Sequence, residues 1–146
     1  MKYTQFTDTV QTLLRKWDLY SPEAVTTICM ITAHESAQGK YRRQVGGGPA
    51  RGLQQIEKVT HDSIWDNSDT IHKRAELHDI HRDFFLLEED DEYGIWVSRH
   101  YLLMDTNPLP KGDINTALYC KAYWNRTGKA TAEKYLKDYW DWSAKL

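Results

Sequence analysis

Cysteine is scarce in this chain of 146 residues, and that scarcity excludes a fold built on disulfides. The two cysteines, Cys29 and Cys120, lie far apart in the sequence, and each falls inside an apolar run. Because cysteine is among the most buried residue types, we expect both thiols in the core and no disulfide framework. A chain of this length can bury a sizeable core without such cross-links.

Long hydrophobic runs and a strong charge of one sign are also absent. No apolar stretch approaches the ~20 residues that a membrane-spanning helix needs. Residues 1–11 lack the cationic head and apolar segment of a secretory signal. The formal net charge is -2, whereas a nucleic-acid-binding domain of this size is usually clearly basic. We therefore expect no membrane span and no nucleic acid partner.

The chain contains no internal repeat, low-complexity segment or linker, and its length predicts one domain over residues 1–146. Apolar spacing predicts a mainly α fold of six or seven helices with at most a small β element. Aromatic residues are abundant, with six Trp, nine Tyr and three Phe. Such rings either pack the core or line a groove that binds sugars.

Helix starts are marked by N-cap residues. Ser21 is followed by Pro22 and Glu23, which is a favourable N-cap, first position and first turn. Thr131 is expected to cap the last helix, in which Tyr135, Leu136, Tyr139 and Trp140 pair at i and i+4. The expected helices cover residues 6–17, 22–36, 57–65, 68–87 (with a possible break), 91–104, 113–125 and the segment from 131 onward.

Glu35 lies near the end of the expected helix over residues 22–36, on the same face as two upstream isoleucines. Burial and the negative end of the helix dipole both raise the pKa of a carboxyl group. A carboxyl group that stays protonated near neutral pH can serve as a general acid, for example toward a glycosidic oxygen. Alternatively, Glu35 is exposed or pairs with Lys40, Arg42 or Arg43.

Several short motifs surround Glu35. His-Glu-Ser at residues 34–36 is followed by a glycine loop and by Arg-Gly-Leu-Gln-Gln-Ile at residues 51–56. Tyr-Trp-Asn at residues 123–125 precedes Gly-Lys-Ala-Thr at residues 128–131. The combination resembles the superfamily of lytic transglycosylases, goose-type lysozymes and phage lysozyme-like proteins. The resemblance implies a lysozyme-like helical domain that cleaves peptidoglycan, and its specific motifs cover residues 33–65 and 119–131.

The resemblance also implies roles for single residues. Glu35 corresponds to the catalytic acid, and Ser36 would support it. Gln55 corresponds to the glutamine that contacts the sugar, and Gln54 stands beside it where the superfamily usually has Met. These residues are therefore expected to bind substrate around Glu35.

A second set of substrate-binding residues follows from the superfamily's Ala-Tyr-Asn motif. This chain has Ala122-Tyr123-Trp124-Asn125, with one more residue between Ala and Asn than that motif. Either Tyr123 or Trp124 therefore takes the place of the motif's tyrosine near the catalytic acid. The alternative for both rings is packing at the end of a helix.

The role of Glu57 distinguishes two related reactions. An inverting hydrolase uses a second carboxylate ~6.5–9.5 Å from the acid to activate water, and Glu57-Lys58 stands where goose-type lysozymes carry Asp-Lys. A lytic transglycosylase instead lets the sugar's own 6-hydroxyl attack, so that one glutamate serves as acid and then as base. Glu57 favours hydrolysis, unless it is only a charged residue at the start of the next helix.

No metal or cofactor is expected. His78 and His81 are three residues apart, with His72 and Glu76 nearby, but the chain has no H-E-x-x-H pattern. It also lacks a phosphate-binding P-loop and a Gly-x-Ser-x-Gly motif. We expect His34, although adjacent to Glu35, to point away from it on the helix.

The expected partner is the glycan strand of peptidoglycan, cut between N-acetylmuramic acid and N-acetylglucosamine. One deployment is a phage endolysin, made in the host cytoplasm and released through a holin to the periplasm and cell wall. The other is a lysozyme carried in the phage virion, in contact with virion proteins. A non-enzymatic reading also stays open, in which a lysozyme-like module binds glycan or another phage protein without cutting.

Overall fold

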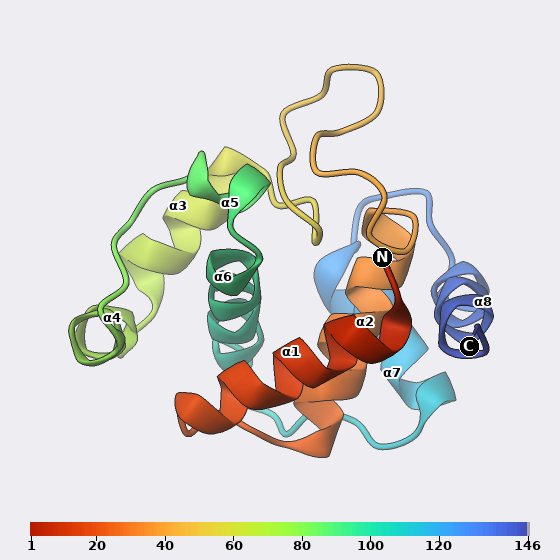
Figure 1. Cartoon of the computed structure of the whole chain (residues 1–146), viewed down its shortest axis with the longest axis horizontal. Coiled ribbons are helices and arrows are strands. Elements are labelled where there is room, and N and C mark those ends of the chain that lie inside the picture. Colours follow the sequence, from red (N-terminus) through yellow and green to blue (C-terminus); the bar gives the residue numbers. More distant parts are fainter. Residues whose placement is uncertain (146) are drawn as a thin grey trace. The chain divides into compact units, whose positions relative to one another are not determined.

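The computed structural model describes residues 1–145, which form eight α-helices and one π-helical turn (Figure 1). This part of the chain has no β-strand, and extended pairing is limited to isolated bridges between Arg43 and Arg51 and between Arg51 and Ile56. The prediction of a mainly α domain is confirmed. No helix within residues 1–145 is both long enough and apolar enough to cross a membrane.

The chain divides into two compact units. Unit 1 consists of Met1–Lys40 and Pro108–Leu146, and unit 2 consists of Tyr41–Asn107. Each unit has its own set of packed helices, so each is described by itself.

Helix α2 (Pro22–Glu35) is the centre of unit 1. It contacts α1 (Tyr3–Lys16), α7 (Asp113–Tyr119), the π-helical turn η1 (Cys120–Trp124) and α8 (Ala132–Ser143). As predicted, the Ser21 hydroxyl caps α2 by accepting from the Ala24 N–H at 3.0 Å. Buried side chains lie on every side of α2, which is the pattern of a helix surrounded by others.

Helices α1 and α8 pack through aromatic rings. The rings of Tyr3 and Phe6 lie 5.4 Å and 5.6 Å from that of Trp142. The predicted cap at Thr131 is confirmed, because its hydroxyl accepts from the Lys134 N–H. Within α8, Tyr139 and Trp142 are buried, whereas Trp140 is 47 % exposed.

Unit 2 is built around α6 (Asp91–Leu103), which contacts α3 (Lys58–Asn67) and α5 (Leu86–Glu89). Helix α4 (Ile71–His78) packs on α3. A single helix over residues 68–87 is not formed, because Asp79 adopts a left-handed conformation (φ 56°) that ends α4.

In unit 1, the helix expected over residues 113–125 begins after Gly112, and its last turn is the π-helical η1.

A buried polar cluster holds α3, α6 and the segment before α5 together within unit 2. The Tyr93 hydroxyl accepts from the Trp65 indole N–H at 3.0 Å and from the Asp83 N–H at 3.2 Å. Its own hydrogen is therefore directed at Nε2 of His61, 2.6 Å away. The His61 Nδ1–H then donates to Asp62 at 2.8 Å, and burial lowers the pKa of His61.

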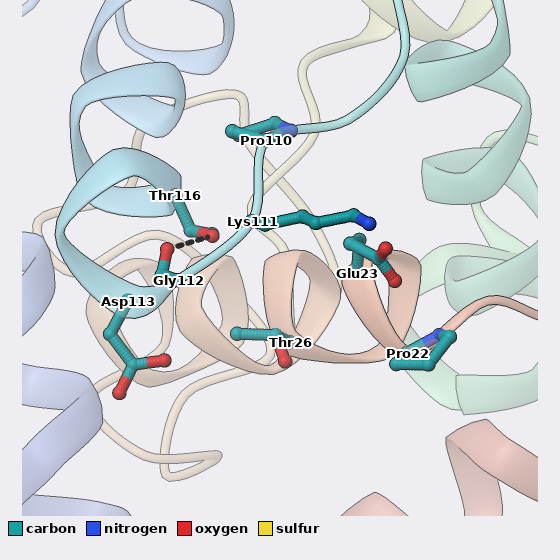
Figure 2. Close-up of a pocket in the computed structure, with 8 residues that line it drawn as sticks. All are labelled: Pro22, Glu23, Thr26, Pro110, Lys111, Gly112, Asp113 and Thr116. Atoms are coloured by element: carbon teal, nitrogen blue, oxygen red, sulfur yellow. Dashed lines mark hydrogen bonds between the residues drawn. The ribbon is translucent and has the colours of Figure 1, made fainter.

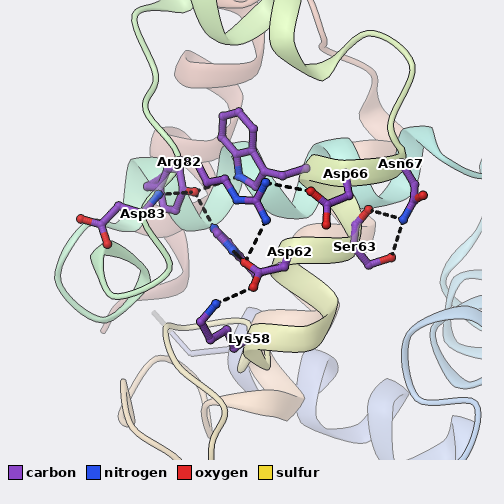
Figure 3. A network of polar contacts seen from close by, with 10 residues as sticks. Lys58, Asp62, Ser63, Asp66, Asn67, Arg82 and Asp83 are labelled. Atoms are coloured by element: carbon purple, nitrogen blue, oxygen red, sulfur yellow. Dashed lines mark hydrogen bonds and ion pairs between the residues drawn. The ribbon is translucent and has the colours of Figure 1, made fainter.

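Ion pairs surround this cluster at the surface (Figure 3). Asp62 binds Lys58 one turn earlier in α3, and it also accepts from Arg82. The other carboxylate on Arg82 is Asp66, at 2.9 Å. The segment between α4 and α5 is thus fixed to α3 by one guanidinium group and two carboxylates.

Replacement of Tyr93 by Phe should destabilise the protein by about 2–4 kcal/mol, because it leaves several buried polar groups without their partner. Equilibrium unfolding in urea measures this loss. Tyr41→Phe is the matched control, since Tyr41 belongs to the same unit and is 47 % exposed. Equal stabilities of the two variants would contradict the importance of the Tyr93 hydroxyl.

Candidate active site

Helix α2 ends at Glu35 because the chain turns sharply after it. Residues 37–39 have positive φ angles of 50°, 64° and 83° in succession. The buried Ser36 hydroxyl donates to the Thr32 carbonyl at 2.8 Å and accepts from the Gly39 N–H at 3.1 Å. Ser36 therefore fixes the end of the helix that carries Glu35, which is a backbone role.

The Glu35 carboxyl group is held by side chains from two other elements of unit 1. The Tyr135 hydroxyl on α8 donates to Oε1 of Glu35 at 2.6 Å. The side chain of Asn125, which follows η1, hydrogen-bonds the same carboxyl group. Burial raises the pKa of Glu35, and the hydrogen bonds from Tyr135 and Asn125 and the charge of His34 oppose that rise.

The alternative pairing of Glu35 with Arg42 or Arg43 is not what the structure has. Both guanidinium groups bind carboxylates of unit 2. Arg42 forms two hydrogen bonds to Asp91, one of them at 3.0 Å, and Arg43 pairs with Glu88. These bonds fix the segment before the glycine loop to α5 and α6.

His34 contacts residues of α8 beside Glu35. Its ring packs on that of Tyr135, with centroids 4.1 Å apart. Its Nδ1 is 2.8 Å from Asp138, which also binds Lys134 at 2.7 Å. His34 therefore supports the tyrosine that holds Glu35, and its charge lowers the pKa of the carboxyl group.

The π-helical turn η1 places the next group of predicted residues. The Asn125 N–H donates to the Cys120 carbonyl at 3.0 Å, which spans five residues instead of four. The Tyr123 ring stacks on Tyr119, with centroids 5.2 Å apart and planes 14° from parallel. Trp124 is half-buried. The Asn125 side chain hydrogen-bonds the Glu35 carboxyl group.

The remaining predicted residues belong to unit 2. Gln54 is buried, and its Oε1 lies against Gly94 of α6, where a Cβ atom would come within 2.8 Å. Gln55 is half-buried, with φ 51°, and its Nε2 donates to the Gly52 carbonyl at 2.8 Å. Glu57 is exposed and stands at the N-cap of α3. The substrate contacts of the glutamines and the catalytic role of Glu57 stay predictions.

A cavity of about 280 Å³ lies elsewhere in unit 1, between the starts of α2 and α7 (Figure 2). None of the predicted site residues lines it. Its walls are Pro22, Glu23, Thr26, Pro110, Lys111, Gly112, Asp113 and Thr116. Within residues 1–145, no group of three or more His, Cys, Asp or Glu side chains is arranged to hold a metal ion.

Two residues of the site were missed by sequence reasoning, Tyr135 and Asp138. Tyr135 stands 100 positions after the glutamate that it contacts. Helical spacing places it on the inner face of α8 but does not tell a core ring from one that holds a carboxyl group. The spacing of Lys134 and Asp138 predicts an ordinary surface pair, so His34 could not be inferred as a third member.

No model of a known protein family matches the chain, and no similar curated protein or solved structure was found.

Replacement of Glu35 by Gln should raise the melting temperature (Tm) at pH 7 by a few degrees, a gain on the order of 1 kcal/mol. The folded-state pKa of Glu35 is raised, so ionisation favours the unfolded chain once the pH exceeds ~4.3. The gain should vanish below that pH. Melting curves from pH 3 to pH 8 measure it, with the exposed Glu133→Gln as control. A gain independent of pH would contradict the burial of an ionisable carboxyl group.

Proposed function

We propose that this chain is a peptidoglycan glycosidase that cleaves the β-1,4 bond between N-acetylmuramic acid and N-acetylglucosamine, with Glu35 as the general acid. The observation that carries the proposal is the half-buried Glu35 carboxyl group at the end of α2, with its pKa raised by partial burial and with Tyr135 and Asn125 hydrogen-bonded to it. The glycan as substrate comes from the motifs around Glu35, which resemble those of the lysozyme and lytic transglycosylase superfamily.

In the first step Glu35 gives its proton to the leaving glycosidic oxygen as the bond to the anomeric carbon breaks. Oε1 accepts a hydrogen bond from Tyr135, so the transferable proton belongs on Oε2. Burial raises the pKa of this carboxyl group, which favours the protonated form that a general acid requires. Tyr135 is a positioning residue in this step, because it orients the carboxyl group and does not take part in the proton transfer.

The second step has two forms. In hydrolysis a water molecule attacks the anomeric carbon, and Glu57 is the carboxylate proposed to position it. In lytic transglycosylation the 6-hydroxyl of the muramic acid attacks, and the Glu35 carboxylate formed in the first step takes up the hydroxyl proton. The first form leaves a reducing end, and the second leaves a 1,6-anhydro ring.

Basic side chains outnumber acidic ones in unit 1, whereas the reverse holds in unit 2. Peptidoglycan carries carboxylate groups on its muramic acid peptides. The excess of basic residues in unit 1 is therefore compatible with this substrate.

Purified peptidoglycan incubated with the protein should yield soluble fragments, and mass spectra of their ends identify the reaction. Glu35→Gln should lower the rate at least ~100-fold, the usual contribution of a general acid. Glu133→Gln is the matched control, since this exposed glutamate lies in the first turn of α8. If the wild-type protein releases no fragments, the enzymatic proposal fails and a glycan-binding module remains.

Glu57→Gln should fold normally, because Glu57 is exposed and makes no side-chain cap bond to α3. If the products carry reducing ends, we expect the rate to fall at least ~10-fold, since a group that activates water is lost. Glu89→Gln, another exposed glutamate of unit 2, serves as control. Full activity of Glu57→Gln would remove Glu57 from the mechanism.

A further inference from the structure

The loop after η1 is closed by a single cation. Lys121, the second residue of η1, donates from Nζ to the Asn125 carbonyl at 3.0 Å and to the Gly128 carbonyl at 2.6 Å. The Asn125 carbonyl also accepts from the Gly128 N–H at 3.3 Å. The last carbonyl groups of a helix have no partner within the helix. The Lys121 ammonium group supplies that partner and joins both ends of the 125–128 loop.

The Asn125 side chain lies between this loop and Glu35. A Cβ atom at position 128 would lie 1.7 Å from Oδ1 of Asn125 and 3.1 Å from its Nδ2. The amide therefore occupies the space that any side chain at Gly128 would need. On its other side the same amide hydrogen-bonds Glu35 and Tyr135. Its orientation is fixed by the loop backbone as well as by the carboxyl group.

We propose that Lys121 is a positioning residue that closes the 125–128 loop and thereby holds the Asn125 amide on the Glu35 carboxyl group. The proposal rests on the proposed role of Glu35 as the acid, and it concerns how the hydrogen-bond donor of that acid is held in place. Lys121 touches neither Glu35 nor the bond that is cut, so its effect passes through Asn125.

The direction of the effect follows from the hydrogen bond. An amide N–H that donates to a carboxylate stabilises the charged form and lowers the pKa of the acid. Loss of the clamp should therefore raise the pKa of Glu35 further and move the alkaline limb of the pH–rate profile to higher pH. The other ionisable groups that face Glu35 are His34 on α2, Tyr135 on α8 and Cys120 on η1. All three stay in place in the variants below.

The test compares four variants of the full chain. Lys121→Met removes the clamp at nearly constant side-chain length, and Lys121→Arg keeps a donor that can bind two carbonyl groups. Gly128→Ala displaces the Asn125 amide by a second route. Lys129→Met is the matched control, because it removes an exposed positive charge from the residue that directly follows the loop. Circular dichroism confirms that each variant is folded.

Two readouts apply. The first is the pH profile of kcat/KM on peptidoglycan. The second needs no activity: the titration of the Glu35 carboxyl carbon and the position of the Asn125 side-chain amide signal, both by NMR. We expect Lys121→Met and Gly128→Ala to raise the Glu35 midpoint and shift the Asn125 signal, while Lys121→Arg and Lys129→Met match the wild type.

Two results would overturn the proposal. One is a wild-type titration and amide signal in both Lys121→Met and Gly128→Ala. The other is a shift in Lys129→Met as large as in Lys121→Met, which would assign the effect to charge and not to the clamp. If the wild-type protein cuts no glycan, the proposed function fails, yet the NMR readout still decides whether Lys121 holds Asn125.

Discussion

Partial burial of a carboxyl group at the end of a helix is costly, and the interior of unit 1 offsets that cost at Glu35 with hydrogen bonds. Helix α2 must end there, so Ser36 and the turn over residues 37–39 stop it. Helix α8 must pack on α2 with Tyr135 at the level of the carboxyl group. The chain after η1 must return to bring Asn125 to the same place. Each of these elements contributes to the core, and all of them meet at the carboxyl group of Glu35.

The local part of this arrangement could be predicted from the sequence. Ser21 and Pro22 mark the start of α2, apolar residues in every direction mark it as central, and Glu35 falls on its buried side. The partners of Glu35 could not be predicted in the same way. Tyr135 has the spacing of an ordinary core ring, and only the packing of α8 on α2 reveals that its hydroxyl meets a carboxyl group. The packing of Gln54 was likewise not predictable, because only the fold shows that its side chain is buried against Gly94.

The spacing of apolar residues could not predict the π-helical turn either. A pattern of apolar residues predicts a continuous helix through residues 113–125, whereas the backbone changes its hydrogen-bonding at Cys120. A π turn accommodates one residue more than an α turn. The widened turn brings Asn125 to the end of η1, where its side chain hydrogen-bonds Glu35.

The close approach of Asn125 to Gly128 limits how this sequence can change over generations. An alanine at position 128 would collide with the amide and force it to move away from its present position. A smaller residue at position 125, however, removes a hydrogen bond from Glu35. Neither position can drift alone without a loss at the carboxyl group, so descendants of this chain that keep the acid should inherit the asparagine and the glycine as a pair.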